Sequence, residues 1–152
     1  MKEEAERFAA VAREFCDLLD TATELEPGDL RERLLRILSA LYLAGLDLPF
    51  EGSDAEYDNV ELQLDFVRLS NHLGENDRYW EVYDPTDKTK PLQGSVALDL
   101  GEIRYDLQQG LLALERGEPL EAVVWEWRHG LEYHWGNHLV DGLRAIHWQR
   151  GW

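Results

Sequence analysis

The segment that decides the fold is PLEAVVWEWRHGLEYHWGNHLVDGLRAIHW, residues 119–148. Trp127, Leu131 and Trp135 recur at intervals of four, which places them on one face of a helix and predicts that this face packs in a core. Pro119 suits the first turn, where an amide hydrogen would have no partner. The pattern predicts one helix from Pro119 to about residue 148, although each glycine inside it weakens that helix by up to about 1 kcal/mol relative to alanine.

Helical periodicity also predicts four helices before this segment. A first helix, marked by apolar residues at steps of three and four, should end near residues 26–28. Asp29 is the expected N-cap of a second helix, with Glu32 three positions further on. A third helix is expected to begin after Asp58 or Asn59 and to end near Leu73.

Residues 79–95, YWEVYDPTDKTKPLQGS, interrupt the helical rhythm. The first part alternates like a short extended piece, and two prolines and a Gly-Ser pair keep the rest irregular. Ser95 can cap a fourth helix that ends at Gly117. The predicted fold is therefore all-α: one domain over residues 1–152, a bundle of about five helices with one irregular or extended excursion between the third and the fourth.

The charge balance limits the classes of partner. The chain has 31 acidic and 15 basic residues, a formal charge of −16, spread along its length. Such a surface repels phosphate groups, so we expect neither nucleic acid nor an anionic membrane as a partner. The excess could serve solubility alone, attract a basic protein partner, or mimic nucleic acid toward a protein that binds it.

The expected compartment is the cytoplasm. Cys16 is the single cysteine, which excludes disulfides and cysteine metal clusters and fits a reducing environment. The first fifteen residues carry four glutamates, a composition unlike that of a signal or transit peptide. No apolar run approaches the length that spans a bilayer.

A candidate metal site follows from His134, His138 and Asp141, whose spacing puts them on one face of the predicted helix. Two imidazoles and a carboxylate can bind a divalent metal, with a further ligand such as His72 or Asp84 supplied from elsewhere. The alternative is that both histidines line the edge of the core and form hydrogen bonds there. No cofactor is expected under that alternative.

No catalytic signature accompanies these residues. Cys16 lies among apolar neighbours that raise a thiol pKa. No serine sits in a Gly-x-Ser-x-Gly turn, and no phosphate-binding loop is present. The sequence therefore favours a protein that is not an enzyme, without excluding a catalytic metal site.

Aromatic residues suggest an interaction patch. It is expected to comprise Tyr79, Trp80, Tyr83, Trp148 and Trp152. Indole and phenol rings are enriched at interfaces because they supply a large apolar area with a polar handle. The two C-terminal tryptophans could form a homodimer contact or a docking patch, or they could pack against their own fold.

Several blocks resemble a bacterial family catalogued as a domain of unknown function, number 5063. They are GSVALDLGEIRYDLQQGLLALERG, EAVVWEWRHGLEYHWGNHLVDGLRAIH, AVAREFCDLL, LLRILSALYLAGLDLP and GENDRYWEVYDP. In that family a Trp-Gly pair precedes a helix ending in Leu-Arg-Ala-Leu-His, and here Ile146 replaces the second leucine. The resemblance implies a small helical bacterial protein with no assigned activity. Its pattern does not require histidine at His134 and His138, so it does not support the metal hypothesis.

Charged residues within these blocks suggest structural pairing. Arg104 or Arg144 could pair with Asp99 or Asp106 and hold the last two helices in register. Taken together, the sequence favours a non-enzymatic protein-interaction module with an acidic surface. The alternatives are a metal-binding or small-ligand-binding bundle and a nucleic-acid mimic.

Overall fold

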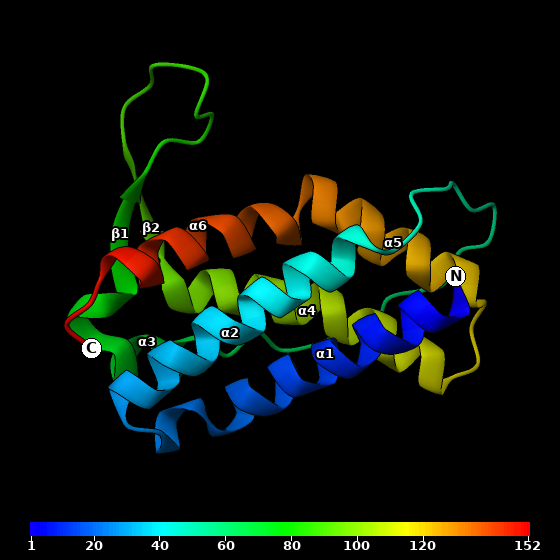
Figure 1. The fold of residues 1–152 in the computed structure, drawn as a ribbon, viewed down its shortest axis with the longest axis horizontal. Helices are drawn as coiled ribbons and strands as arrows, with labels where there is room; N and C mark the ends of the chain where they lie inside the picture. Colours follow the sequence, from blue (N-terminus) through cyan, green and yellow to red (C-terminus); the bar gives the residue numbers. More distant parts are fainter.

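Six α-helices and a β-hairpin make up the chain in the computed structural model, which describes residues 1–152 (Figure 1). The helices are α1 (Lys2–Thr21), α2 (Pro27–Leu46), α3 (Val67–Leu73), α4 (Val96–Glu115), α5 (Leu120–Tyr133) and α6 (Trp135–Trp148). Short 3-10 turns, η1 (Ala22–Glu24) and η2 (Gly74–Asp77), follow α1 and α3. The strands are β1 (Arg78–Glu81) and β2 (Leu92–Ser95).

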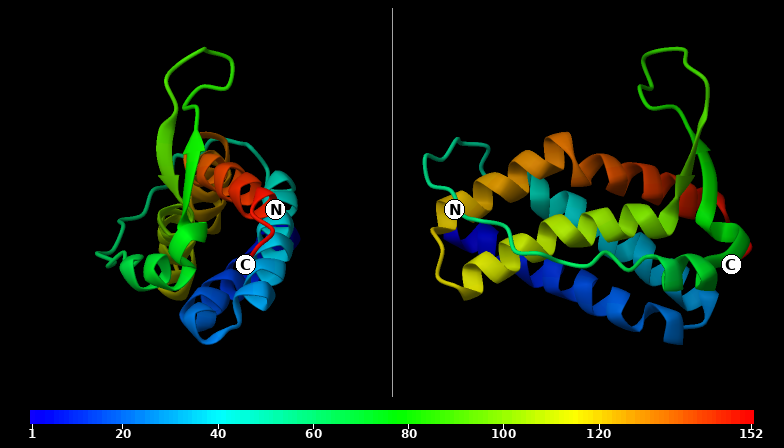
Figure 2. Two further views of the ribbon diagram at one scale, coloured as in Figure 1. Left: turned by 90° about the vertical axis from the view of Figure 1, so that its left-hand side faces the viewer. Right: turned by 180° about the vertical axis from the view of Figure 1, so that it is seen from behind.

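The long helices run along the length of the bundle. Figure 2 shows α1, α2, α4 and the α5–α6 pair side by side, with the two termini at opposite ends. The hairpin stands away from the bundle at the end where α6 stops. The predicted all-α fold is confirmed, and the differences from it concern where individual helices begin, end and break.

The predicted last helix is in fact two helices that meet at His134. The backbone there has φ −141° and ψ −87°, outside the helical region. Two glycines permit the close approach at this break. A Cβ on Gly136 would lie 1.9 Å from the carbonyl oxygen of Leu131, and one on Gly130 would lie 2.5 Å from Cδ1 of Trp135. These glycines therefore allow a sharp bend, which the periodicity of the sequence did not reveal.

Two tryptophans of this segment lie in the core, as predicted. Trp127 and Trp135 are both essentially fully buried, and the ring of Phe8 on α1 lies 4.8 Å from that of Trp127. The indole N–H of Trp135 donates to the carbonyl oxygen of Trp127 across 2.9 Å. Trp135 thus fills the core and satisfies a carbonyl on α5 near the break.

The third predicted helix is much shorter than expected. Only Val67–Leu73 is helical, and residues 47–66 have no regular secondary structure. The buried side chain of Gln109 on α4 explains part of this difference. Its amide oxygen accepts the N–H of Val60 at 2.9 Å, and its amide nitrogen donates to the carbonyl of Val60 at 2.7 Å. A tertiary contact therefore replaces helical hydrogen bonds at this position.

Two helix starts can be compared with their predicted caps. Helix α2 begins at Pro27 with Glu26 as N-cap, so the prediction of Asp29 is wrong by three residues. Proline at the first helical position needs no amide partner, and its fixed φ suits a helix start. The predicted cap at Ser95 is confirmed, because its hydroxyl oxygen accepts the N–H of Leu98 at 3.1 Å.

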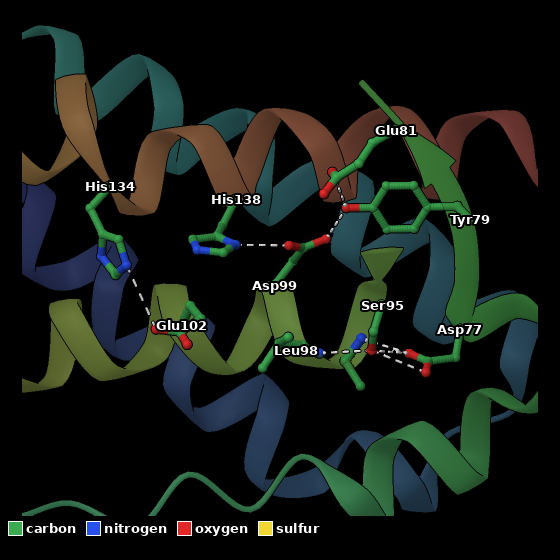
Figure 3. Close-up of polar contacts among 10 residues, drawn as sticks. Asp77, Tyr79, Glu81, Ser95, Leu98, Asp99, Glu102, His134 and His138 are labelled. Atoms are coloured by element: carbon green, nitrogen blue, oxygen red, sulfur yellow. Dashed lines mark hydrogen bonds and ion pairs between the residues drawn. The ribbon is translucent and has the colours of Figure 1, made fainter. Parts of the chain in front are cut away.

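The segment after α3 is more ordered than predicted. Strands β1 and β2 pair in antiparallel register, with Arg78 opposite Ser95 and Glu81 opposite Leu92. Buried Asp77 fixes the base of this hairpin (Figure 3). Its carboxylate accepts the hydroxyl of Ser95 at 3.0 Å and the N–H of Ala97 at 2.8 Å. The hairpin is therefore tied to the first turn of α4.

The close approach at the helix break leads to a stability prediction. Gly136→Ala should lower the free energy of unfolding by at least about 1–3 kcal/mol, because the added Cβ collides with backbone at Leu131. Urea denaturation followed by circular dichroism measures the change. Gly28→Ala on α2 is the control, since nothing lies within 4 Å of its Cβ position. Equal stability of the two variants would contradict the proposed constraint.

Candidate functional site

The polar site begins with the alternation of side chains along β1. Arg78 and Trp80 are exposed, whereas Tyr79 and Glu81 are half-buried, as expected for successive residues of a strand. The hydroxyl of Tyr79 donates a hydrogen bond to Asp99 on α4 and lies 3.2 Å from Oε2 of Glu81. Tyr79 therefore anchors the hairpin to the helical bundle (Figure 3).

Asp99 continues this network to α6. It is 6% exposed, and its Oδ1 lies 2.8 Å from Nδ1 of His138. Burial raises the pKa of Asp99, while the hydrogen bonds from His138 and Tyr79 oppose that rise. The hydrogen bond to Asp99 is the main cause that raises the pKa of His138. Both directions favour a proton held between the carboxyl and the imidazole.

His134 lies one turn before His138, at the break between α5 and α6. Its Nδ1 is 2.6 Å from Oδ2 of Asp106, and its Nε2 is 3.7 Å from Oε2 of Glu102. The two imidazole rings are 5.2 Å apart and nearly perpendicular. The break in the helix thus brings both predicted histidines against the polar face of α4.

The third predicted ligand, Asp141, does not join the histidines. Its carboxyl group and that of Glu81 on the hairpin instead line the same pocket. Burial, followed by the charges of Glu81 and Asp99, raises the pKa of Asp141 to about 6. Glu102 lies close to the two histidines instead. Glu102 was not among the ligands predicted from the sequence.

A signal for Glu102 was present in the sequence. Asp99, Glu102 and Asp106 are spaced by three and four, so they share a face of α4. The additional ligands suggested by the sequence lie elsewhere. Nε2 of His72 lies 3.3 Å from the carbonyl oxygen of Leu25, and Asp84 accepts the backbone N–H of Thr86.

The predicted ion pairs between an arginine and Asp99 or Asp106 do not form. Arg104 pairs with Asp20 on α1 at 2.6 Å, and Arg144 is exposed and forms no ion pair. The two aspartates do connect α4 with the last part of the chain, but through His138 and His134. The expected link between helices therefore exists with imidazole in place of guanidinium.

The aromatic residues of the predicted patch divide into two groups. Trp80, Tyr83 and Trp148 are 70%, 86% and 77% exposed. Tyr79 belongs to the polar network, and half-buried Trp152 packs against the core. A pocket of about 420 Å³ lies between β1 and α6, and Trp80 and Trp148 both line it.

Cys16 offers little nucleophilic chemistry. It is buried in α1, and burial raises the pKa of its thiol to about 11. Only a very small fraction of the thiol is ionised at neutral pH. This agrees with the expectation from its apolar sequence neighbours.

Fold and site define a small helical bundle that carries a hairpin and a cluster of histidines and carboxylates. The chain belongs to the family described as a domain of unknown function (DUF5063), whose model matches residues 1–150. The resemblance noted in the sequence is thereby confirmed.

A solved structure with a similar fold is the crystal structure of protein BF1032 from Bacteroides fragilis. The TM-score is 0.80 and the sequence identity 24%, over 95% of this chain and 90% of that one. At this identity the likeness shows the fold alone. No curated protein is significantly similar in sequence. Each helix is too short or too polar to cross a membrane.

The anchor at Tyr79 can be tested by removing one oxygen atom. Tyr79→Phe should lower the free energy of unfolding by about 1–3 kcal/mol, because it leaves a buried carboxylate oxygen of Asp99 without its donor. Chemical denaturation at pH 7 measures the change. Tyr83→Phe is the matched control, since Tyr83 is 86% exposed and its hydroxyl forms no hydrogen bond within the protein. A Tyr79→Phe protein as stable as this control would rule out the anchor.

The raised pKa of Asp141 predicts a pH dependence of stability. Between its ordinary pKa of 3.8 and about 6, the native carboxyl keeps a proton that the unfolded chain loses. Its contribution to stability is thus full at low pH and is lost as the pH rises through about 6. Relative to Asp141→Asn, the wild-type protein should become less stable from pH 4.5 to about 7 in urea titrations.

Asp84→Asn is the control. Hydrogen bonds from Thr86 lower the pKa of Asp84 below its ordinary value of 3.8, so its contribution to stability is fully present above that pH, and the wild type compared with this variant should show no slope from pH 4.5 to about 7. The same slope for both comparisons would contradict the assignment to Asp141.

Proposed function

We propose that this protein is a protein-interaction module that binds its partner through one end of the bundle. The surface involved, called here the hairpin–α6 surface, comprises Trp80, Tyr83 and Trp148. The observation that carries the proposal is that all three rings are 70–86% exposed. A buried tryptophan at an interface removes roughly 150–250 Å² from water, and truncation of such an anchor often costs 2 kcal/mol or more of binding energy.

The position of the hairpin supports this proposal. Tyr79 holds one side of β1 through its hydrogen bond to Asp99, while the next residue, Trp80, points outward. A docking residue on a strand anchored in this way loses little conformational freedom on binding, which favours affinity. Leu92 of β2 is also exposed and extends the apolar area.

The partner that fits best is a protein with a positively charged surface. The formal charge of −16 steers such a partner toward this chain and raises the association rate. Within the pocket, Arg78 and Arg144 balance Glu81 and Asp141. Charge therefore acts over the molecule as a whole, whereas the aromatic rings supply local affinity.

Binding of cellular proteins to immobilised protein tests the proposal. Trp80→Ala and Trp148→Ala should each weaken the affinity of a captured, purified partner at least about tenfold, the equivalent of 1.4 kcal/mol. Tyr133→Ala is the control, because Tyr133 is 65% exposed on α5, outside the hairpin–α6 surface. Higher salt should slow association with a basic partner.

Several outcomes would count against this function. Capture that is unchanged in both tryptophan variants rules out the hairpin–α6 surface. Native mass spectrometry of the wild type and of Trp148→Ala identifies a second copy of the chain as the occupant if a dimer is lost in the variant. A captured nucleic-acid-binding protein that DNA displaces would favour mimicry of nucleic acid.

A further inference from the structure

Three side chains of the histidine cluster are of types that bind metal ions and lie close together. Glu102 comes from α4, His134 from the α5–α6 break and His138 from α6 (Figure 3). One ligand atom from each lies within 4.8 Å of the other two. We propose that these residues bind one divalent transition-metal ion, of which zinc is the representative. This site is separate from the hairpin–α6 surface.

The main support for this site comes from the carboxylates that contact the two histidines. Nδ1 of His134 contacts Asp106 at 2.6 Å, and Nδ1 of His138 contacts Asp99 at 2.8 Å. A proton on each Nδ1, donated to its carboxylate, leaves Nε2 with the lone pair that a metal requires. Histidines that bind metals almost always donate their other N–H in this way. Here both histidines have that support.

Glu102, the third ligand, lies on the Nε2 side of His134. Oε2 of Glu102 lies 3.7 Å from Nε2 of His134, the nitrogen that its contact with Asp106 leaves free. A tetrahedral zinc ion with bonds of about 2.1 Å separates its ligand atoms by about 3.4 Å. The ligand atoms of the three side chains are at most 4.8 Å apart, so each pair must move closer by no more than about 1.4 Å to bind the ion. The side chains of Glu102 and His134 are 27% and 48% exposed, which leaves room for that movement.

The electrostatic setting favours a divalent cation. Asp99, Glu102 and Asp106 lie on one face of α4, and none of them pairs with lysine or arginine. Arg104 on the same helix pairs with Asp20 instead. A bound ion would supply positive charge that no lysine or arginine provides at this face.

The donor types define the class of ion. Two imidazole nitrogens and one carboxylate oxygen suit zinc and other divalent transition metals, whereas calcium and magnesium prefer oxygen ligands. Three protein ligands leave one position of a tetrahedral ion for water or another small donor. The exposure of His134 gives that position access to solvent.

Titration of chelator-treated protein with zinc tests the site. Isothermal calorimetry and native mass spectrometry should show one ion per chain, and zinc should raise the thermal midpoint. Glu102→Gln and His134→Ala should each lower the affinity by more than about 100-fold, and Asp106→Asn by about 10–100-fold. Tetrahedral Co²⁺ bound in place of zinc should show visible absorption that His138→Ala abolishes.

His147→Ala is the matched control, because His147 is an exposed histidine on α6 outside the cluster. It should bind zinc like the wild type. Circular dichroism identifies any variant that fails to fold. Glu102→Gln, which keeps the size of the side chain, keeps the test valid if His138→Ala does not fold. Absence of zinc binding by the folded wild type would overturn the proposal. So would equal losses in His147→Ala and His134→Ala, which indicate adventitious binding to surface histidines.

Discussion

The break between α5 and α6 is the constraint on which the rest of the structure depends. Trp135 fills the core at the break, and its indole N–H satisfies the carbonyl of Trp127. Gly130 and Gly136 permit the close approach. A continuous helix through this point would send residues after Tyr133 in another direction. With the break, His134 and His138 lie against α4, and the end of α6 reaches the base of the hairpin (Figure 1).

Helix α4 supplies the polar partners for both regions of interest. Asp106 contacts His134, and Asp99 contacts both His138 and Tyr79. Asp99 thus belongs at once to the support of the histidine cluster and to the anchor of the hairpin. A buried carboxylate with several hydrogen-bond partners is costly to leave unsatisfied, so its contacts reinforce one another. The hairpin–α6 surface and the proposed metal site are therefore neighbours joined by one side chain, although each has its own test.

Much of the fold was predictable because it depends on local patterns. Apolar spacing showed which faces of the helices are buried, and Ser95 was correctly identified as the cap of α4. The clustering of histidines predicted a site at His134 and His138, and the structure places both against carboxylates of α4. The extent of α3 could not be predicted, because the side chain of Gln109 binds the backbone of Val60 from far along the chain. No local propensity encodes such a contact.

The sequence by itself determined the helical class, the buried tryptophans, the acidic charge and the likeness to the family. Each of these depends on composition or on neighbours within a few residues. Only the tertiary structure decided that Glu102, rather than Asp141, lies with the histidines, and that Asp99 pairs with His138 rather than with an arginine. The physical reason is that α4 and α6, which are separated along the chain, pack against each other. Spacing along α6 relates His138 to Asp141, but it does not predict which side chains of α4 they meet.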